Sequence, residues 1–275
     1  MTDRRLTPAN ARVAHVSLQG AVTGVRLVEG EWARVSAPVA DLLAKPDGRR
    51  DRQVLMGERV LVLERHAGFG FVQAEKDGYC GYLSGDALGP DLDVTHWVAA
   101  PATHLYAAPD LKAPDLAMLS CGSKLAVVAE HPRFLETADG SFAPRQHLRP
   151  IGDWLTDPAT VAEAYLGTPY LWGGNSRAGI DCSGLVQLAL VSCGISCPGD
   201  SDQQLASLGK DLPAESGFQR GDLLFWKGHV AMAVDGARII HANAYKMAVT
   251  LEDTRAAIDR IEAQGEGALL AARRL

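Results

Sequence analysis

The sequence lacks the features that mark membrane-spanning, secreted and fibrous proteins. Its 275 residues contain no apolar run near the roughly 18–20 residues that a membrane helix requires. The N-terminal segment includes Arg4 and Arg5 but no apolar segment after them, which argues against a secretory signal peptide. The 28 glycines and 14 prolines follow no G-X-Y period, which excludes a collagen-like chain. We therefore expect no insertion into a membrane.

The sequence also lacks the cysteine pattern of a disulfide-bonded protein. The 5 cysteines are odd in number and unevenly spaced, at Cys80, Cys121, Cys182, Cys193 and Cys197. This arrangement argues against a disulfide framework and favours a reducing compartment. Together with the absence of a signal peptide, it predicts a cytoplasmic protein.

An excess of basic charge is absent as well. The formal net charge is −6, and the residues from Gly152 onward are the more acidic part. We therefore expect no nucleic-acid partner, whereas a cationic or amine-bearing ligand would suit the acidic half. The 47% hydrophobic and 22% charged residues are typical of a folded globular protein. The length suffices for about two domains, or three if some are small.

The sequence does contain an internal repeat in its first half. The segments 35–47 (VSAPVADLLAKPD) and 98–110 (VAAPATHLYAAPD) are identical at seven of thirteen positions. Each copy consists of short apolar runs, rich in β-branched residues and separated by Gly, Pro and Asp turns, a pattern typical of strands. We expect a small barrel from each copy, because closure of the sheet removes its exposed edges.

After Pro150 the pattern changes to helices followed by strands. Asp157-Pro158 predicts the start of a first helix, because it combines an N-cap residue with proline at the first helical position. Further helices are predicted over 182–193 and from Ser201 to Gly209, and strands over 222–226, 229–234 and 237–243. The tail, 254–275, has a helical composition. Helices first and strands afterwards predict an α+β domain.

Cys182 lies where a glycine-rich loop (YLWGGNSRAGIDCSG, 170–184) meets the predicted start of a helix. A helix N-terminus presents unpaired N–H groups and a partial positive charge, which favour a thiolate and can hold a developing oxyanion. We therefore expect an activated nucleophile here. The alternative is an inert small residue, which is the commoner role for a lone cysteine.

A nucleophile of this kind needs a base, and the base needs an orienting group. His229 and His241 lie on adjacent predicted strands, on either side of an Asp235-Gly236 turn. Side chains alternate between the faces of a strand, so both imidazoles share a face only if paired residues have an even index sum. A two-residue turn at Asp235-Gly236 gives an index sum of 471, which is odd and would place the two imidazoles on opposite faces. A three-residue loop, with Val234 opposite Arg238, gives 472 and allows a catalytic pair.

Packing residues and metal ligands are the alternatives for the two histidines. A metal is disfavoured, because Cys193 and Cys197 have a C-x3-C spacing and no Cys or His pair to complete four ligands. Trp226 is interpreted as a core residue.

Together, DCSG after the WGG loop, GH before an alternating strand and IIHA one hairpin later resemble the NlpC/p60 family of cysteine peptidases. These enzymes have a papain-like core and cleave peptidoglycan stem peptides. The repeats in front resemble bacterial SH3-like domains, with DGYCGYL (77–83) in the first copy and the divergent DGSFAPRQHL (139–148) in the second. We therefore expect an N-terminal segment (1–30), two SH3-like domains (31–95 and 96–150) and a peptidase domain (151–275).

This arrangement is similar to the γ-D-glutamyl-L-diamino acid endopeptidases of the dipeptidyl-peptidase VI type. The resemblance implies hydrolysis of the γ-D-Glu–diamino acid bond in free murein stem peptides, L-Ala-γ-D-Glu-diaminopimelate or -Lys, during peptide recycling. Cys182 would be the nucleophile, His229 the general base and then the acid, and His241 the residue that orients His229. No metal or organic cofactor is implied.

The resemblance also implies substrate-binding roles near the nucleophile and in the first barrel, at Tyr170, Asp181, Ser183, Ser201, Tyr79 and Glu58. Trp172 is expected to form a wall of the cleft. The family motif around Ser201 usually reads RDS, and Gly199 stands here in place of the arginine.

A closed pocket for the free amine of an N-terminal L-Ala needs anionic or hydroxyl partners, which Asp181, Glu58 and Tyr79 would supply. Each also has a structural interpretation: a helix N-cap, a solvated turn residue and half-buried barrel packing, respectively.

Three other functions remain open from the sequence. One is a lytic endopeptidase that acts outside the cell on intact peptidoglycan. Another is a catalytically inactive protein whose SH3-like pair binds peptides. The last is an acyltransferase, although relatives of that type commonly have His before Cys, the reverse of the order here.

Overall fold

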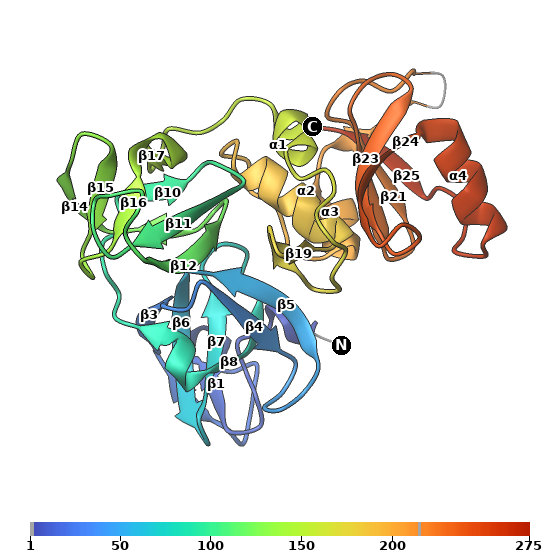
Figure 1. The fold of residues 1–275 in the computed structure, drawn as a ribbon. Helices are drawn as coiled ribbons and strands as arrows, with labels where there is room; N and C mark the ends of the chain where they lie inside the picture. The colour runs from blue at the N-terminus through green and yellow to red at the C-terminus, as the bar shows by residue number, and fades with distance from the viewer. Residues whose placement is uncertain (1–2, 214–215) are drawn as a thin grey trace. The chain divides into compact units, whose positions relative to one another are not determined.

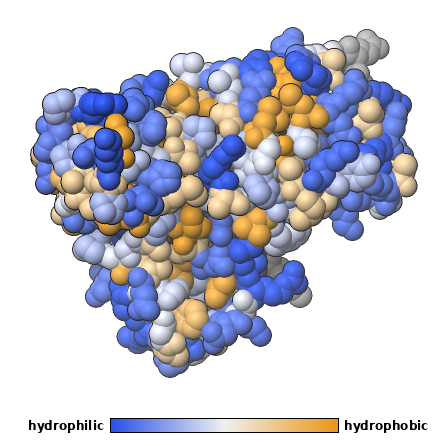
Figure 2. Space-filling model, viewed as in Figure 1, coloured by the Kyte–Doolittle hydropathy of each residue, from blue (hydrophilic) through white to orange (hydrophobic). Residues whose placement is uncertain are grey.

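The computed structural model describes residues 3–213 and 216–275 and divides the chain into two compact units, which meet in sequence at Ile151 and Gly152. Figure 1 shows a first unit rich in strands and a second that holds the α-helices. Hydrophilic residues cover most of the face in Figure 2, with smaller hydrophobic patches between them. Within the described residues, no helix is both long enough and apolar enough to cross a membrane. The five cysteines are free thiols.

The first unit begins with short elements that precede the first barrel. Strands β1 (Val13–His15) and β2 (Arg26–Val28) pair in parallel, and the 3-10 helices η1 (Arg4–Leu6) and η2 (Val16–Leu18) flank β1.

The first barrel is a sheet with the strand order β5-β4-β8-β7-β6-β3-β9. Its elements are β3 (Glu31–Val35), β4 (Val39–Leu43), β5 (Arg50–Leu55), β6 (Arg59–His66), β7 (Phe69–Ala74), β8 (Cys80–Ser84), η3 (Gly85–Ala87) and β9 (Leu88–Gly89). Alternate residues are buried in β3 and β4, the period expected of a strand with one buried side. Strands β6 and β7 are buried on both faces, because Leu61, Leu63 and Phe71 pack in a second cluster with Val13. Leu42, Val60, Val72 and Leu83 are fully buried in its core.

The second copy follows a similar order, but two short strands, β13 and β14, take the place of the single β6, and its strands form two sheets, β13-β10-β17 and β12-β11-β16-β15-β14. It contains β10 (His96–Val98), β11 (Ala102–Tyr106), β12 (Asp115–Ser120), β13 (Lys124–Leu125), β14 (Val127–Glu130), β15 (Phe134–Thr137), β16 (Phe142–Pro144), η4 (Arg145–His147) and β17 (Leu148–Pro150). Strands β4 and β11 occupy matching positions within the two segments of the sequence repeat. Val98, Leu119 and Ala143 are fully buried in its core. The prediction of two similar β structures is confirmed.

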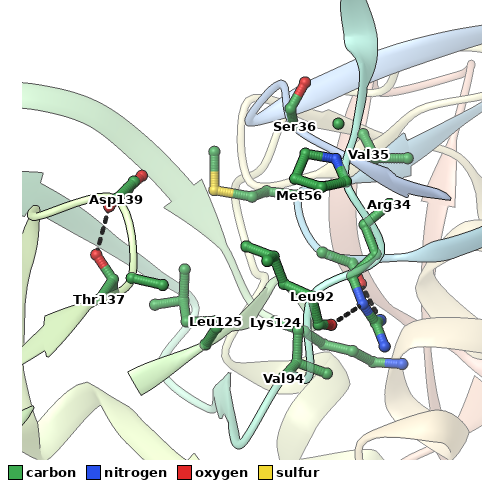
Figure 3. Close-up of a pocket in the computed structure, with 15 residues that line it drawn as sticks. Arg34, Val35, Ser36, Met56, Leu92, Val94, Lys124, Leu125, Thr137 and Asp139 are labelled. Atoms are coloured by element: carbon green, nitrogen blue, oxygen red, sulfur yellow. Dashed lines mark hydrogen bonds between the residues drawn. The ribbon is translucent and has the colours of Figure 1, made fainter. Parts of the chain in front are cut away.

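Backbone contacts join the two copies within the first unit at a glycine turn. Lys124 N–H donates to the Met56 carbonyl at 2.8 Å, and the next residue, Gly57, has φ of +77°. A pocket of about 240 Å³ opens beside this contact, with Met56, Leu92 and Leu125 among its walls (Figure 3). A Cβ atom on Gly57 would lie 2.1 Å from the Lys124 carbonyl oxygen, so this packing requires glycine.

We expect Gly57→Ala to destabilise the protein more than Gly68→Ala does. Both glycines have positive φ, but a Cβ on Gly68 would meet no atom within 4 Å. Gly68→Ala therefore costs the left-handed backbone penalty alone, about 1–2 kcal/mol. Gly57→Ala adds a clash with the Lys124 backbone, of the order of 1–3 kcal/mol. Thermal unfolding midpoints test this difference, and equal midpoints for the two variants would contradict the packing described.

The second unit contains α1 (Pro158–Glu163), β18 (Asn175–Ser176), β19 (Gly179–Ile180), α2 (Cys182–Val191), α3 (Ser201–Ser207), β20 (Lys210–Asp211), β21 (Leu223–Trp226), β22 (His229–Ala233), β23 (Arg238–Asn243), β24 (Ala248–Asp253), α4 (Thr254–Ala263) and β25 (Ala271–Arg274). Its main sheet is antiparallel, in the order β20-β25-β21-β22-β23-β24. Helix α4 packs on it through Ala257 and Ile261, which contact a buried cluster that includes Trp226 and Ile239 (Figure 1). The expected α+β class is confirmed.

Three features of this unit differ from the prediction. The helix that starts at Cys182 ends at Val191 rather than near residue 193. The tail is only partly helical: after α4 it returns as β25, which pairs with both β20 and β21. Strand β24 was not predicted, and it completes the sheet beside β23.

Candidate active site

Cys182 is the first residue of α2, and Asp181 is the N-cap of that helix. The Asp181 side chain accepts hydrogen bonds from Gly184 N–H at 2.7 Å and, through its other oxygen, from Gly173 N–H at 2.8 Å. These bonds tie the glycine-rich loop to the first turn of the helix. Asp181 therefore has the capping role that the sequence allowed, and it holds the Cys182 backbone at the N-terminal end of the helix.

The hairpin of β22 and β23 brings the two histidines to one face of the sheet. Met232 pairs with Ile240 and Ala233 with Ile239, so the index sum is 472. The connecting loop, 235–237, has three residues, because Val234 N–H donates to the Arg238 carbonyl at 2.9 Å. Within the loop, Asp235 accepts hydrogen bonds from Ala237 and Arg238 N–H. The three-residue alternative of the parity argument is confirmed.

The histidine rings are in direct contact. His229 Nε2 lies 2.9 Å from His241 Nδ1. His241 is 1% exposed, and its Nε2 lies 3.1 Å from Glu252 Oε2. Glu252 in turn accepts a bidentate pair of hydrogen bonds from Arg260, at 2.8 Å each. Arg260 and His241 lower the pKa of Glu252 to about 2, so its carboxyl group is ionised at neutral pH.

The Cys182 sulfur lies beside the start of β22. Its Sγ is 4.0 Å from the carbonyl oxygen of Gly228, the residue that precedes His229. Burial raises the pKa of Cys182 to about 12, with a further contribution from the Asp181 charge, although nearby backbone N–H groups oppose the rise. Burial and His241 lower the pKa of His229 to about 3. Burial of the sulfur therefore opposes the thiolate that the helix N-terminus favours, and the activated nucleophile stays a prediction.

The other predicted residues of this unit differ in burial and in contacts with the nucleophile. Tyr170 is half-buried, and burial together with the Cys182 and Asp181 charges raises the pKa of its phenol. Ser183 is buried, and its hydroxyl donates to Asp181 Oδ1 at 3.2 Å. Ser201 is half-buried at the start of α3, and Trp172 is 62% exposed in the loop before Asp181.

Glu58 and Tyr79 lie in the first unit. Glu58 is only 4% exposed, so its interpretation as a solvated turn residue is wrong. Its Oε1 accepts from Lys76 Nζ at 2.8 Å, whereas its buried Oε2 has no hydrogen-bond partner among the described residues. Tyr79 is fully rather than half buried, in the core of the first barrel, with the Arg52 guanidinium 5.2 Å from its ring centroid.

Three residues near the histidines were missed or undervalued by sequence reasoning. Trp226 is buried as expected, but its ring also packs 5.6 Å from that of His229. Glu252 and Arg260 continue the hydrogen-bonded chain that starts at His229. An alternating run after residue 247 would have revealed β24, and the turn before it is marked by Asn243, whose Oδ1 accepts from Lys246 N–H, rather than by a glycine. Among residues 3–213 and 216–275, no group of three or more His, Cys, Asp or Glu side chains could hold a metal ion.

Comparison with known proteins identifies both parts of the chain. Residues 167–260 match the model of the NlpC/P60 family, and residues 42–88 match that of the bacterial dipeptidyl-peptidase SH3 domain. A γ-D-glutamyl-L-lysine dipeptidyl-peptidase of Bacillus subtilis is 30% identical over 215 residues, which are 69% of this chain and 71% of the relative. The chain belongs to the NlpC/P60 family.

Further NlpC/P60 proteins agree with this assignment. A γ-D-glutamyl-L-lysine dipeptidyl-peptidase of Bacillus cereus is 28% identical and covers 70% of this chain and 67% of its own length. The crystal structure of an NlpC/P60 family protein from Bacillus cereus has the same fold, with a TM-score of 0.74. It is 23% identical and covers 89% of this chain and 99% of its own. This NlpC/P60 protein is therefore a cysteine peptidase, a hydrolase of peptides.

Proposed function

We propose that the protein hydrolyses the bond between γ-D-Glu and the diamino acid of free murein stem peptides, as a step in cell-wall peptide recycling. Two relatives are named γ-D-glutamyl-L-lysine dipeptidyl-peptidases, which supports this bond as the target. The observation that carries the proposal is the contact of His229 with His241, beside a cysteine at a helix N-terminus. The cytoplasmic location expected from the sequence stays a prediction.

In the proposed acylation step, Cys182 is the nucleophile and His229 the base. His229 Nε2 is engaged by His241, so Nδ1 is the nitrogen left to accept the thiol proton. The sulfur attacks the γ-carbonyl carbon while that proton moves to Nδ1, and the carbonyl oxygen becomes an oxyanion. Backbone N–H groups at the start of α2 are suited to hold it. Collapse breaks the C–N bond, and His229 returns the proton to the departing amine.

Hydrolysis of the thioester uses the same groups in reverse order. His229 Nδ1 accepts a proton from water as the water oxygen attacks the thioester carbon. The tetrahedral intermediate expels the sulfur, which recovers the proton from His229 and restores the neutral pair. The products are L-Ala-D-Glu and the free diamino acid, either diaminopimelate or lysine. His241 orients His229 in both steps.

The proposed substrate contacts follow the residues singled out in the sequence. Tyr170, Asp181 and Ser183 are suited to bind the substrate next to the nucleophile, because their polar groups lie around Cys182. Ser201 and Trp172 are proposed as further contacts of the peptide. Glu58 and Tyr79 are proposed as partners of the free amine of the N-terminal L-Ala. The role of Glu58 follows from the resemblance found in the sequence; in the structure this residue is 4% exposed and accepts a hydrogen bond from Lys76.

The amine requirement is tested with L-Ala-γ-D-Glu-L-Lys and its N-acetylated form, with products identified by mass spectrometry. We expect acetylation to lower kcat/KM by about 100-fold or more, because it leaves polar groups of a closed site unpaired. Glu58→Gln should slow cleavage of the free peptide and narrow the difference between the two substrates. Glu75→Gln, at an exposed carboxylate paired with Arg59, is the matched control. Equal rates on both peptides, or release of fragments from intact peptidoglycan, would favour a wall-lytic enzyme instead.

A further inference from the structure

Glu252 lies on the same face of the sheet as the two histidines. In the β23–β24 ladder His241 pairs with Thr250 and Ile239 with Glu252, so Glu252 is the diagonal neighbour of His241. Its side chain reaches His241 Nε2, the nitrogen on the far side of the ring from His229. The Glu252 carboxylate is thus connected to the proposed base, His229, through the ring of His241.

Arg260 fixes the position of this carboxylate. It comes from α4, which packs on this face, and binds both oxygens of Glu252 through its Nε and Nη2. The guanidinium also lies over the Tyr245 ring, 4.4 Å from its centroid. Bidentate pairing of this kind restricts the orientation of a carboxylate more than a single hydrogen bond does.

The contacts of Glu252 determine where the protons of the two histidines lie. An ionised carboxylate can only accept, so His241 Nε2 must carry a proton and donate it. In neutral His241, Nδ1 is then an acceptor, and His229 Nε2 must donate to it. A neutral His229 protonated on Nε2 has a free lone pair on Nδ1, which is the form that a base for the Cys182 thiol requires.

We propose that Glu252 is a positioning residue that acts through His241, holding His229 in the tautomer that accepts the thiol proton and stabilising the imidazolium that results. The proposal rests on the proposed roles of Cys182 and His229. Arg260 has a double effect: it orients Glu252 and offsets part of its charge. The active unit is then a chain of four side chains, Cys182, His229, His241 and Glu252.

The charges that act on this chain come from several elements. His229 is influenced by His241 on β23, Glu252 on β24 and Arg260 on α4. Cys182 is influenced by Asp181, and Tyr170 faces both of these residues. The charges of Tyr245 and Glu266 also raise the pKa of Arg260. The carboxylate of Glu252 raises the pKa of His229 and the guanidinium of Arg260 lowers it, so the two have opposite effects on transfer of the thiol proton.

These opposite effects provide the test. In the full-length protein, the pH dependence of Cys182 alkylation by iodoacetamide is compared for wild type, Glu252→Gln and Arg260→Met. We expect Glu252→Gln to raise the midpoint by about one pH unit or more, a tenfold lower thiolate fraction at fixed pH. Arg260→Met should lower the midpoint, because it leaves the carboxylate uncompensated. Glu252→Gln should also lower kcat about tenfold with KM little changed.

Asp253→Asn is the matched control. It removes a neighbouring carboxylate on the same strand, and asparagine can keep the N-cap bond to Ala256 N–H. Its alkylation midpoint should equal that of wild type. If Glu252→Gln does not fold, the downward shift in Arg260→Met still tests the proposal.

Midpoints that move in the same direction in both variants, or not at all, would show that Glu252 is only structural. His229→Ala separates this outcome from a failure of the proposed catalytic pair. If its alkylation profile equals that of wild type, the roles of Cys182 and His229 are wrong. If it differs while Glu252→Gln matches wild type, only the role of Glu252 is wrong.

Discussion

Replacing Cys182 by alanine is expected to lower kcat/KM on L-Ala-γ-D-Glu-L-Lys by about 10⁴-fold or more, because no other group can form the thioester. That loss corresponds to about 5.5 kcal/mol of transition-state stabilisation. The fold should persist: Cys182 is a small residue at a helix start whose N-cap, Asp181, remains in place. Release of L-Ala-D-Glu, followed by mass spectrometry, measures the effect.

Cys193→Ala is the matched control for Cys182→Ala. Cys193 lies in the same unit, just beyond the end of α2, and is half-buried. Its removal tests whether loss of any thiol from this unit impairs the enzyme. We expect activity close to that of wild type. Substantial residual cleavage by Cys182→Ala would mean that the cleavage does not proceed through this cysteine.

Those features that depend on local pattern could be predicted from the sequence. The repeat of one segment in a second predicted two equivalent β structures, and β4 and β11 lie at matching positions in the two segments. The parity of the hairpin register follows from strand geometry alone, so the three-residue loop at 235–237 could be named as the condition for bringing His229 and His241 together.

Features that depend on burial and on distant partners could not be predicted in this way. The helix start at Cys182 favours a thiolate, but burial of the sulfur raises its pKa, and only the packing of the folded chain reveals that burial. Glu58 follows a turn and looks solvated, yet it is 4% exposed. Glu252 lies on a strand that no glycine turn precedes: the connection from β23 uses Met247 with φ of +52°.

Replacing His229 by alanine is expected to lower kcat/KM by about 10³-fold, within the range typical of general acid–base catalysis. The residual activity should be sensitive to hydroxide, since the raised pKa of Cys182 keeps the thiol protonated at neutral pH without a base. His241→Ala alone should cost less than His229→Ala, because His241 does not accept the thiol proton itself.

The double variant His229→Ala/His241→Ala decides whether the two histidines act as a unit. Their rings are 2.9 Å apart at the facing nitrogens, and His241 acts only through His229 in the proposed mechanism. Once His229 is absent, removing His241 should therefore reduce kcat/KM no further, a strongly non-additive result. His66→Ala, at an exposed histidine of the first unit, controls for the loss of an imidazole. Additive losses in the double variant would mean that His241 contributes to catalysis independently of His229, which the chain of hydrogen bonds from Glu252 does not allow.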